Sequence, residues 1–332
     1  MFSAREEWAL KKFERLRAKL REKVERRELL VAPGAYDALS ARIIERAGFE
    51  AAYMTGHGTG AGMLAWSDVG LTTMTEMVWN VRNICNAIDI PLIADMDTGY
   101  GNAVNVVRAV REFEQAGASA VHIEDQQMPK KCGFMEGKLV IPMEEMVGKI
   151  RAAVEVREDP NFLIIARCDA RAVLGAEEMY RRCEAYRKAG ADVIFPEAPL
   201  TMDDIRNDAE WGKKIGAPLL LNGVRYGLDK KEIASLGYSI LILPIMLFPV
   251  AAKAMYDVLM DLKKTGRYDD LEKSGKAFSF HVIQELIRLP EIKKYEETYL
   301  PKELKMARWG AEAVPPEPFE GLGPSSDPKG LG

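Results

Sequence analysis

The chain has 332 residues, of which 48% are hydrophobic, so it can bury one large core or two ordinary ones. Its 46 Lys and Arg against 50 Asp and Glu leave a net charge of −4 without a basic block, which excludes the electrostatic signature of a nucleic-acid-binding or anionic-membrane-binding protein. Four cysteines are too few for a disulfide scaffold, and neither a signal peptide nor a run of about 20 apolar residues is present. We therefore expect a cytoplasmic protein with small-molecule partners.

Residues 1–28 are predicted to form a highly charged helix, centred on Glu6–Arg27. Such a helix could close the bottom of a barrel or contact another subunit. A solvated helix is the simpler interpretation.

Eight short, apolar, β-rich runs follow, separated by segments with helical periodicity. The predicted strands are Leu29–Pro33, Ala51–Thr55, Pro91–Asp97, Ala118–Asp125, Phe162–Asp169, Asp192–Pro196, Pro218–Asn222 and Tyr238–Pro244. The predicted helices include Tyr36–Ala47, Thr73–Ile88, Val104–Ala116, Pro142–Arg157, Ala176–Ala189 and Leu228–Leu236. Eight β-then-α units predict an α/β fold, a (β/α)8 TIM barrel over residues 29–266. A doubly wound dinucleotide-binding sheet is disfavoured, because Gly56–Gly60 lacks the Gly-x-Gly-x-x-Gly spacing.

Beyond the eighth strand, Val250–Lys264 is predicted to be the last barrel helix. Phe278–Leu289 and Glu291–Tyr299 add a C-terminal helical extension, residues 267–313, which exceeds what barrel closure needs. Such extensions often pack on a neighbouring subunit and so indicate a homo-oligomer. Residues 314–332, rich in Pro, Gly and Ser, have the composition of a disordered tail.

Three acids lie near the ends of the third and fourth predicted strands, on the face of the barrel where active sites lie. Asp95 and Asp97 are two residues apart, so their side chains should lie on the same side of the strand, and Glu124 holds the matching place on the next strand. Oxygen-only ligands suit Mg²⁺, with Mn²⁺ as the alternative. A structural reading, with Asp as an ordinary strand-end residue, is the weaker one.

A glycine-flanked segment after the fourth strand carries Lys130, Lys131 and Cys132. Two neighbouring ammonium groups should lower the pKa of the thiol, which could then exchange a proton near neutral pH. An isolated cysteine is more often inert core, but this polar surrounding argues against that reading. Cys85, Cys168 and Cys183 keep the structural reading.

Polar residues also end the other strands. Arg167 is suited to a substrate carboxylate, because its guanidinium can bind the carboxylate bidentately. Taken alone, an arginine at such a position is more often a structural ion-pair partner, here of Glu197. His57 could be a simple loop residue. The remaining candidates are Tyr53, Thr55 and Asn222.

Together these motifs resemble the isocitrate lyase and phosphoenolpyruvate mutase superfamily, and within it the methylisocitrate lyase and 2,3-dimethylmalate lyase branch. The resemblance covers roughly residues 25–290 and rests on Tyr53–Gly56, Asp68, Asp95–Gly101, Glu124–Asp125, Lys130–Gly133, Arg167, Glu197 and Asn222. It implies a (β/α)8 barrel with a swapped eighth helix, a homotetramer and bound Mg²⁺.

The resemblance also implies a role for each matching residue. Asp95 and Asp97 would bind the metal, with Glu124 reaching it directly or through water. Cys132 would be the catalytic acid, supported by a charge pair between Asp68 and Lys130. The 2-oxo-acid pocket would be formed by Thr55, Gly56, His57, Gly133, Arg167, Glu197 and Asn222.

The implied reaction is a retro-aldol cleavage of a 2-hydroxy di- or polycarboxylic acid, yielding pyruvate or glyoxylate and a second carboxylic acid. The substrate hydroxyl would lose its proton toward Tyr53, and the metal would stabilise the resulting oxyanion. Cys132 would then protonate the carbanion of the other fragment.

Three positions depart from the tricarboxylate lyases of this family. Phe134 replaces a His, Val224 replaces a Thr, and the segment through Pro249 lacks an Arg. A carboxylate stranded among such apolar groups would cost several kcal/mol. We therefore expect a leaving fragment that is more apolar than succinate.

Three alternatives remain from the sequence. Decarboxylation of oxaloacetate or another 2-oxo acid would use the same metal pocket without needing Cys132. Phosphonate mutation fits less well, because those family members lack Lys-Lys-Cys-Gly. The non-enzymatic alternative is a barrel that binds a 2-oxo acid without catalysing a reaction.

Overall fold

The computed structural model describes residues 4–133, 135–223, 229–267, 271–301 and 304, with side chains from residue 11 onward. It divides into a barrel unit, Met1–Glu45 with Phe49–Pro249, and a C-terminal unit, Arg46–Gly48 with Val250–Gly332. Within the described part of the chain, none of the helices combines the length and the apolar character needed to span a bilayer. Phe134, Val224 and the predicted tail at 314–332 lie outside the described residues.

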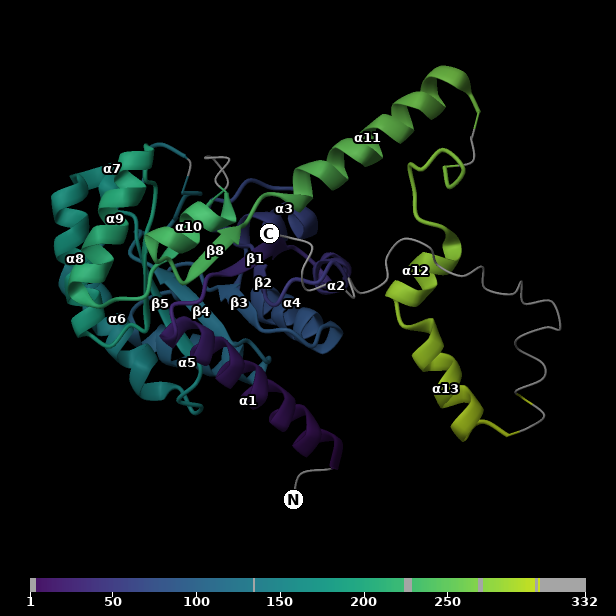
Figure 1. Ribbon diagram of the computed structural model, residues 1–332, viewed down its shortest axis with the longest axis horizontal. Helices are drawn as coiled ribbons and strands as arrows, with labels where there is room; N and C mark the ends of the chain where they lie inside the picture. Colours follow the sequence, from purple (N-terminus) through teal and green to yellow (C-terminus); the bar gives the residue numbers. More distant parts are fainter. Residues whose placement is uncertain (1–3, 134, 224–228, 268–270, 302–303, 305–332) are drawn as a thin grey trace. The chain divides into compact units, whose positions relative to one another are not determined.

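The barrel unit contains eight parallel strands in the order β6-β5-β4-β3-β2-β1-β8-β7 (Figure 1). A parallel bridge between Ile194 and Leu219, next to a 2.9 Å hydrogen bond from Ile194 N to Pro218 O, brings the two edges together. The strands are β1 (Leu30–Ala35), β2 (Ala52–Met54), β3 (Leu92–Asp95), β4 (Ala120–Glu124), β5 (Leu163–Cys168), β6 (Val193–Pro196), β7 (Leu220–Asn222) and β8 (Ile240–Leu243). The predicted (β/α)8 barrel is therefore confirmed, with β1 one residue longer and the other strands shorter than expected.

Helices follow the strands and surround them (Figure 1). They are α2 (Ala38–Arg46), α3 (Gly56–Leu64), α4 (Met74–Ala87), α5 (Ala103–Gln115), α6 (Met143–Val156), α7 (Arg171–Leu174), α8 (Ala176–Lys188), α9 (Met202–Ile215) and α10 (Lys230–Leu236). Capping boxes at Thr73, Asn102 and Thr201 begin α4, α5 and α9. The glycine-rich α3 was not predicted, because its four glycines lower helix propensity. Thr55 caps this helix by accepting a hydrogen bond from Gly58 N at 3.2 Å.

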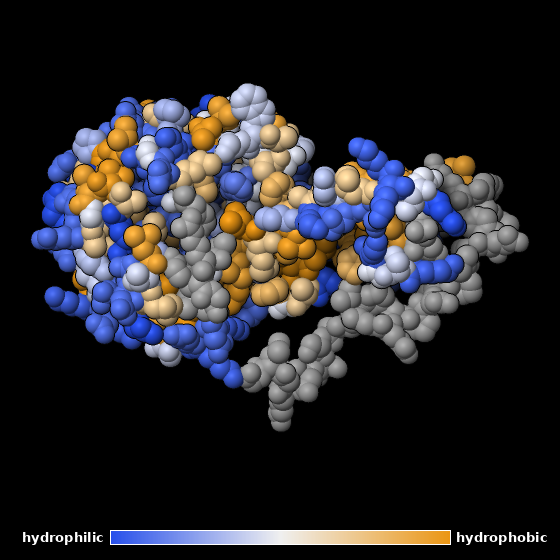
Figure 2. Space-filling view, turned by 90° about the horizontal axis from the view of Figure 1, so that it is seen from above, coloured by the Kyte–Doolittle hydropathy of each residue, from blue (hydrophilic) through white to orange (hydrophobic). Residues whose placement is uncertain are grey.

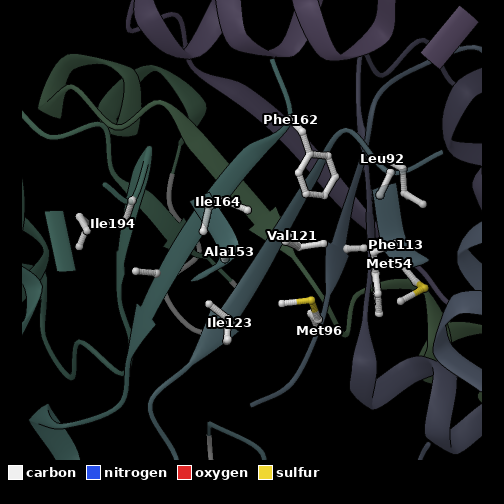
Figure 3. Packing of buried hydrophobic residues seen from close by; sticks show 14 of the residues in the cluster. Met54, Leu92, Met96, Phe113, Val121, Ile123, Ala153, Phe162, Ile164 and Ile194 are labelled. Atoms are coloured by element: carbon white, nitrogen blue, oxygen red, sulfur yellow. The ribbon is translucent and has the colours of Figure 1, made fainter. Parts of the chain in front are cut away.

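Alternation along the strands separates two apolar clusters. Residues such as Tyr53, Ile93 and Ile165 face the barrel interior. Their neighbours, such as Met54, Leu92 and Ile164, face the surrounding helices and pack against residues such as Phe113 (Figure 3). This two-residue period decides which polar side chains reach the barrel interior further along each strand.

The N-terminal helix α1 (Ala4–Glu25) is not a solvated helix, so that interpretation is wrong. Leu16, Leu20 and Val24 are buried, and the latter two belong to the interior cluster of the barrel. Arg17 anchors the helix by donating from Nε to Ala118 O at 3.0 Å. Burial of one apolar stripe explains why a helix with so many charges docks over the start of the strands.

The C-terminal unit contains most of α11 (Leu247–Thr265), together with α12 (Phe280–Leu286) and α13 (Leu289–Tyr299). Three large apolar side chains of α11, Met255, Leu259 and Leu262, recur at helical spacing and are 61%, 62% and 40% exposed. Figure 2 shows hydrophobic residues reaching the surface among hydrophilic ones. Such an apolar helical stripe is typical of a surface that a partner covers.

Candidate active site

The inward register of the strands continues into a polar layer at their C-terminal ends, where active sites of TIM barrels lie. Tyr53 is in the interior cluster, and the interior positions Ile93, Ile165, Phe195 and Leu220 are each followed two residues later by a polar side chain. From the interior position Ala120 the same alternation leads through His122 to Glu124. The residues placed this way are Tyr53, Asp95, Glu124, Arg167, Glu197 and Asn222. The period-two pattern thus brings these predicted site residues to one end of the barrel.

Asp95 lies at the centre of this layer and is 5% exposed. Its Oδ2 accepts hydrogen bonds from Gly56 N at 3.2 Å and from the Tyr53 hydroxyl at 3.3 Å. Its Oδ1 accepts from Asp97 N at 3.0 Å. These bonds fix the carboxylate and orient it toward the cavity that it lines.

Asp97 is close to Asp95 for a reason different from the expected one. β3 ends at Asp95, and Asp97 lies beyond it in the left-handed region, at a φ of 47°. Its Oδ1 is 2.7 Å from the ammonium of Lys130, which also binds Asp68. Burial raises the pKa of Asp97 to about 6, against the opposing effect of Lys130. The prediction that a continuous strand aligns the two acids is wrong, because the turn itself brings them together.

The pair of Lys130 and Asp68 is present, and it extends to Asp97. Burial disfavours the ammonium form of Lys130, but Asp97 and Glu124 outweigh that effect and keep its pKa well above the ordinary value. Lys130 therefore stays positively charged beside the acids.

Glu124 is fully buried at the end of β4. Its Oε2 lies 3.2 Å from an η nitrogen of Arg167, yet neither carboxylate oxygen accepts a well-aligned hydrogen bond among the described residues. Burial raises the pKa of Glu124 well above its ordinary value. A buried carboxylate with unused lone pairs is stabilised by a nearby cation.

These acids fit a hard divalent cation. Carboxylate oxygens are the ligands that Mg²⁺ and Mn²⁺ prefer, and Mg²⁺ commonly binds one or two carboxylates directly and keeps several waters. Asp95, Asp97 and Glu124 could therefore hold such an ion partly through water. Both oxygens of Glu124 lack a hydrogen-bond partner among the described residues, which agrees with this donor set, whereas Oδ1 of Asp97 is paired with the Lys130 ammonium.

Arg167 is 8% exposed and lines the cavity. Asp169 accepts hydrogen bonds from Nε of Arg167 at 2.8 Å and from one of its η nitrogens at 3.0 Å. Asp169 and Glu124 therefore hold the guanidinium in place. The sequence had suggested Glu197 as the ion-pair partner instead. The guanidinium has five N–H donors, which leaves donors for a ligand carboxylate. Asp169 is one of the polar residues that the sequence places at the end of the fifth strand, where it was given no role.

Glu197 and Asn222 close the adjacent wall. The Asn222 amide nitrogen is 3.5 Å from Oε1 of Glu197, whose pKa is raised by burial. A side chain at Gly133 would lie 2.4 Å from that same oxygen. The backbone of the Cys132 segment therefore sits directly against Glu197 and Arg167, at a distance only glycine allows.

Gly56 has a similar close approach. A Cβ at this position would lie 2.5 Å from Oδ2 of Asp95. Thr55 is 1% exposed and, with His57, lines the cavity. The unpredicted helix α3 begins at these residues, so its first turn forms part of the cavity wall.

Cys132 lines the mouth of the cavity on the segment between β4 and α6. Its backbone nitrogen donates to Asp68 O at 3.0 Å. Gln126 holds the neighbouring residue through two bonds with Lys131, from Lys131 N at 3.0 Å and to Lys131 O at 2.9 Å. Cys132 is half-buried, whereas Cys85, Cys168 and Cys183 are buried, in agreement with their structural reading.

His122 is a site residue that the sequence reasoning missed. It is fully buried on β4, with Nε2 at 2.6 Å from the Tyr53 hydroxyl and 3.4 Å from Oδ1 of Asp95. Burial, and then Arg167, lowers its pKa to about 3, so the ring is neutral. The signal was available, because His122 precedes Glu124 by two residues and so shares its face of the strand.

Apolar residues form another part of the cavity wall: Phe195, Ile242, Pro244 and Ile245. Pro249, one of the three expected apolar substitutions, is exposed at the start of α11 and is not among the lining residues. The other two, Phe134 and Val224, lie outside the described residues.

Comparison with known proteins adds independent information. The sequence profile of the family described as phosphoenolpyruvate phosphomutase matches residues 20–263. The chain is 44% identical over 283 residues to 2,3-dimethylmalate lyase of Eubacterium barkeri, covering 85% of this chain and 97% of the relative. It is 43% identical over 256 residues to 2-methylisocitrate lyase of Aeropyrum pernix, covering 76% and 81%. The structure of phosphonopyruvate hydrolase with oxalate and Mg²⁺ superposes with a TM-score of 0.79 at 33% identity, covering 86% and 99%.

Proposed function

The chain belongs to the phosphoenolpyruvate phosphomutase and isocitrate lyase superfamily and is a carbon–carbon lyase, and from that premise we propose that it cleaves a 2-hydroxy diacid with an apolar substituent at C3. The products would be a 2-oxo acid and a second carboxylic acid. A 2,3-dialkylmalate is the preferred substrate class, in line with the name of the 44% identical relative.

One observation carries this proposal: the lining of the cavity combines charged and polar side chains with apolar ones. Arg167, Asp95 and Thr55 provide cationic, acidic and hydroxyl groups, which suit the carboxylate and hydroxyl of a 2-hydroxy acid. Phe195, Ile242 and Ile245 provide apolar surface, which suits an alkyl group. A second carboxylate placed against these apolar side chains would lose its solvation.

We propose that Mg²⁺ is the metal, held by Asp95 and Asp97 with Glu124 directly or through water. When bound, the ion would supply positive charge for the developing oxyanion. The solved relative with oxalate and Mg²⁺ supports this choice.

The chain's own residues would move two protons. Burial and the Asp95 carboxylate raise the pKa of Tyr53, so its hydroxyl is a hydrogen-bond donor unless positive charge near Asp95 offsets that effect. In the cleavage, the substrate hydroxyl would give its proton to Tyr53, which accepts it as a phenolate once positive charge is bound near Asp95. The bond between C2 and C3 breaks, C2 becomes a carbonyl carbon, and the electron pair of the bond stays on C3. The S–H proton of Cys132 then adds to C3, and the proton held by Tyr53 returns to the sulfur through solvent, which balances the reaction.

A homotetramer in which the eighth barrel helix, α11, is swapped between subunits also remains a proposal. The exposed apolar side chains of α11, Met255, Leu259 and Leu262, support it, because a second copy of the chain would remove them from water.

The first experiment is a substrate panel with Mg²⁺. It contains 2-hydroxy diacids with methyl, larger alkyl or aryl groups at C3, together with methylisocitrate and oxaloacetate, and 2-oxo acid is detected as its hydrazone. Pyruvate or glyoxylate from an alkyl-substituted member, but not from methylisocitrate, is the expected result. Turnover of methylisocitrate would overturn the apolar-fragment argument, and consumption of oxaloacetate alone, spared by Cys132→Ser, would identify a decarboxylase instead.

A further inference from the structure

Three potential metal ligands of mixed chemistry meet at the mouth of the cavity. A ring nitrogen of His57, a carboxylate oxygen of Asp68 and the sulfur of Cys132 lie within 4.8 Å of one another, and all three residues are half-buried. Within the described chain they are the one group of three or more such residues this close together. The set does not include the acids assigned to Mg²⁺.

Three separate segments bring the set together. His57 is in the first turn of α3, Asp68 follows α3, and Cys132 lies between β4 and α6. The 3.0 Å bond from Cys132 N to Asp68 O ties the last two segments, and the ring of Phe248 lies edge-on to His57 at 6.4 Å between centroids. Contacts within the cavity wall therefore position these three residues.

A second observation points to a ligand. Nδ1 of His57 is buried and has no hydrogen-bond partner among the described residues. A buried ring nitrogen without a partner is unfavourable and becomes satisfied when it binds a proton donor or a metal. Asp68 uses one oxygen for Lys130, and a carboxylate has a second oxygen for another partner.

We propose that His57, Asp68 and Cys132 form a site for a borderline-soft divalent cation, Zn²⁺ in the first place. Nitrogen, oxygen and thiolate sulfur are its usual protein ligands, with a fourth position left for water, whereas Mg²⁺ avoids sulfur and nitrogen. With bond lengths of about 2.0–2.3 Å, tetrahedral zinc places its ligand atoms about 3.3–3.8 Å apart. The three ligand atoms, now within 4.8 Å of one another, would therefore have to approach one another by about 1 Å. Thiolate, carboxylate and the Lys130 ammonium sum to one negative charge, which also favours a dication.

This site has a consequence that rests on the proposed function. The sulfur that holds zinc cannot donate its proton to the product carbanion, so zinc at this site would inhibit cleavage while Mg²⁺ remains on the separate acids. The binding itself does not depend on which reaction the protein catalyses.

Cobalt provides the test, because Co²⁺ replaces Zn²⁺ and a thiolate ligand produces a near-ultraviolet sulfur-to-metal charge-transfer band. The reduced full-length protein, saturated with Mg²⁺, is titrated with Co²⁺ and then with Zn²⁺. We expect one equivalent of Co²⁺ to produce the band and Zn²⁺ to abolish it. The band should be lost in Cys132→Ser, and His57→Ala should weaken Co²⁺ binding at least about tenfold, the usual scale for losing a metal-site contact.

The matched control is His281→Ala. His281 lies on α12 in the C-terminal unit and is paired with Glu285 at 3.5 Å, so its loss should leave the titration unchanged. Unchanged circular dichroism and melting temperature show that each variant is folded. Absence of the sulfur band, or equal Co²⁺ affinity in His57→Ala and the unmodified protein, overturns the site. The titration needs no turnover, so a negative substrate panel would refute the lyase proposal and leave this result intact.

Discussion

Lys138 donates a hydrogen bond to the carbonyl oxygen of Gly133 across 2.7 Å, in a buried position beside the candidate active site. The same ammonium lies 3.1 Å from Oδ1 of Asp169. Asp169 in turn accepts two hydrogen bonds from Arg167. One lysine thus connects the backbone next to Cys132 with the residue that holds the proposed carboxylate clamp.

Lys138→Met should therefore misplace the Cys132 segment while leaving the bonds between Arg167 and Asp169 in place. We expect kcat to fall by about tenfold to a hundredfold, with a smaller rise in KM, because misplacement of a catalytic group by about 1 Å has this effect. Unfolding free energy should fall by about 1–3 kcal/mol, since a buried carbonyl and a buried carboxylate each lose a partner. Steady-state kinetics and urea denaturation measure both.

Leu139→Ala is the control, because this neighbouring side chain is 59% exposed. An equal loss of kcat in both variants, or an unchanged kcat in Lys138→Met, would contradict a positioning role for Lys138.

Gly56→Ala tests the proposed Mg²⁺ site. The new Cβ would lie 2.5 Å from Oδ2 of Asp95, which forces that carboxylate to move. In the unmodified protein, Mg²⁺ at about 100 times its dissociation constant should add about 2.7 kcal/mol of stability, seen as a higher melting temperature. We expect the variant to lose most of that Mg²⁺-dependent increase and most of its activity.

A second glycine substitution controls for the added methyl group. Gly148 lies within α6, and a Cβ there meets nothing within 4 Å. Gly148→Ala should keep the full response to Mg²⁺ and gain up to about 1 kcal/mol of stability, because alanine restricts the unfolded chain and favours the helix. A normal Mg²⁺ response in Gly56→Ala would refute the assignment of Asp95.

Alkylation should distinguish the cysteines by burial and charge. Burial raises the pKa of Cys85 to about 12, so at pH 8 only about one thiol in ten thousand is ionised. Raising the pH to about 10 still leaves Cys85 protonated, because the pH remains below the raised pKa. We expect iodoacetamide to label Cys132 first at both pH values, as measured by peptide mass spectrometry.

Labelling in urea, where all four cysteines should react, supplies the reference for complete modification. If Cys85 in the folded protein reacted as fast as Cys132, the structural reading of Cys85 would be wrong.

The exposed apolar stripe of α11 predicts that copies of this chain associate with one another. If a second copy covers it, Leu259→Glu should shift the protein to smaller species in multi-angle light scattering, because the buried carboxylate would lose its solvation. Lys264 lies on the face of α11 opposite the stripe, so the Lys264→Glu variant should keep the native mass. A monomeric native protein, or an unchanged mass in Leu259→Glu, would refute this prediction.

Much of the site could be predicted because alternation along a strand is a local property. Interior apolar residues at Ile93 and at Ile165 place Asp95 and Arg167 on the same inward face, whatever the loops do. His122 and Glu124 follow the same rule, so His122 could have been found. The order of strands and helices was likewise readable from the chain, with strand ends displaced by a residue or two.

By itself, then, the sequence determined the barrel, the inward-facing acids and the family. Only the tertiary structure decided the contacts made by turns: Asp97 beside Lys130, Lys138 against Gly133, and His57 near Asp68 and Cys132. A turn residue such as Asp97, at a φ of 47°, follows no period that a sequence displays. Contacts between segments far apart in the chain depend on how every intervening loop folds, and that information is not local.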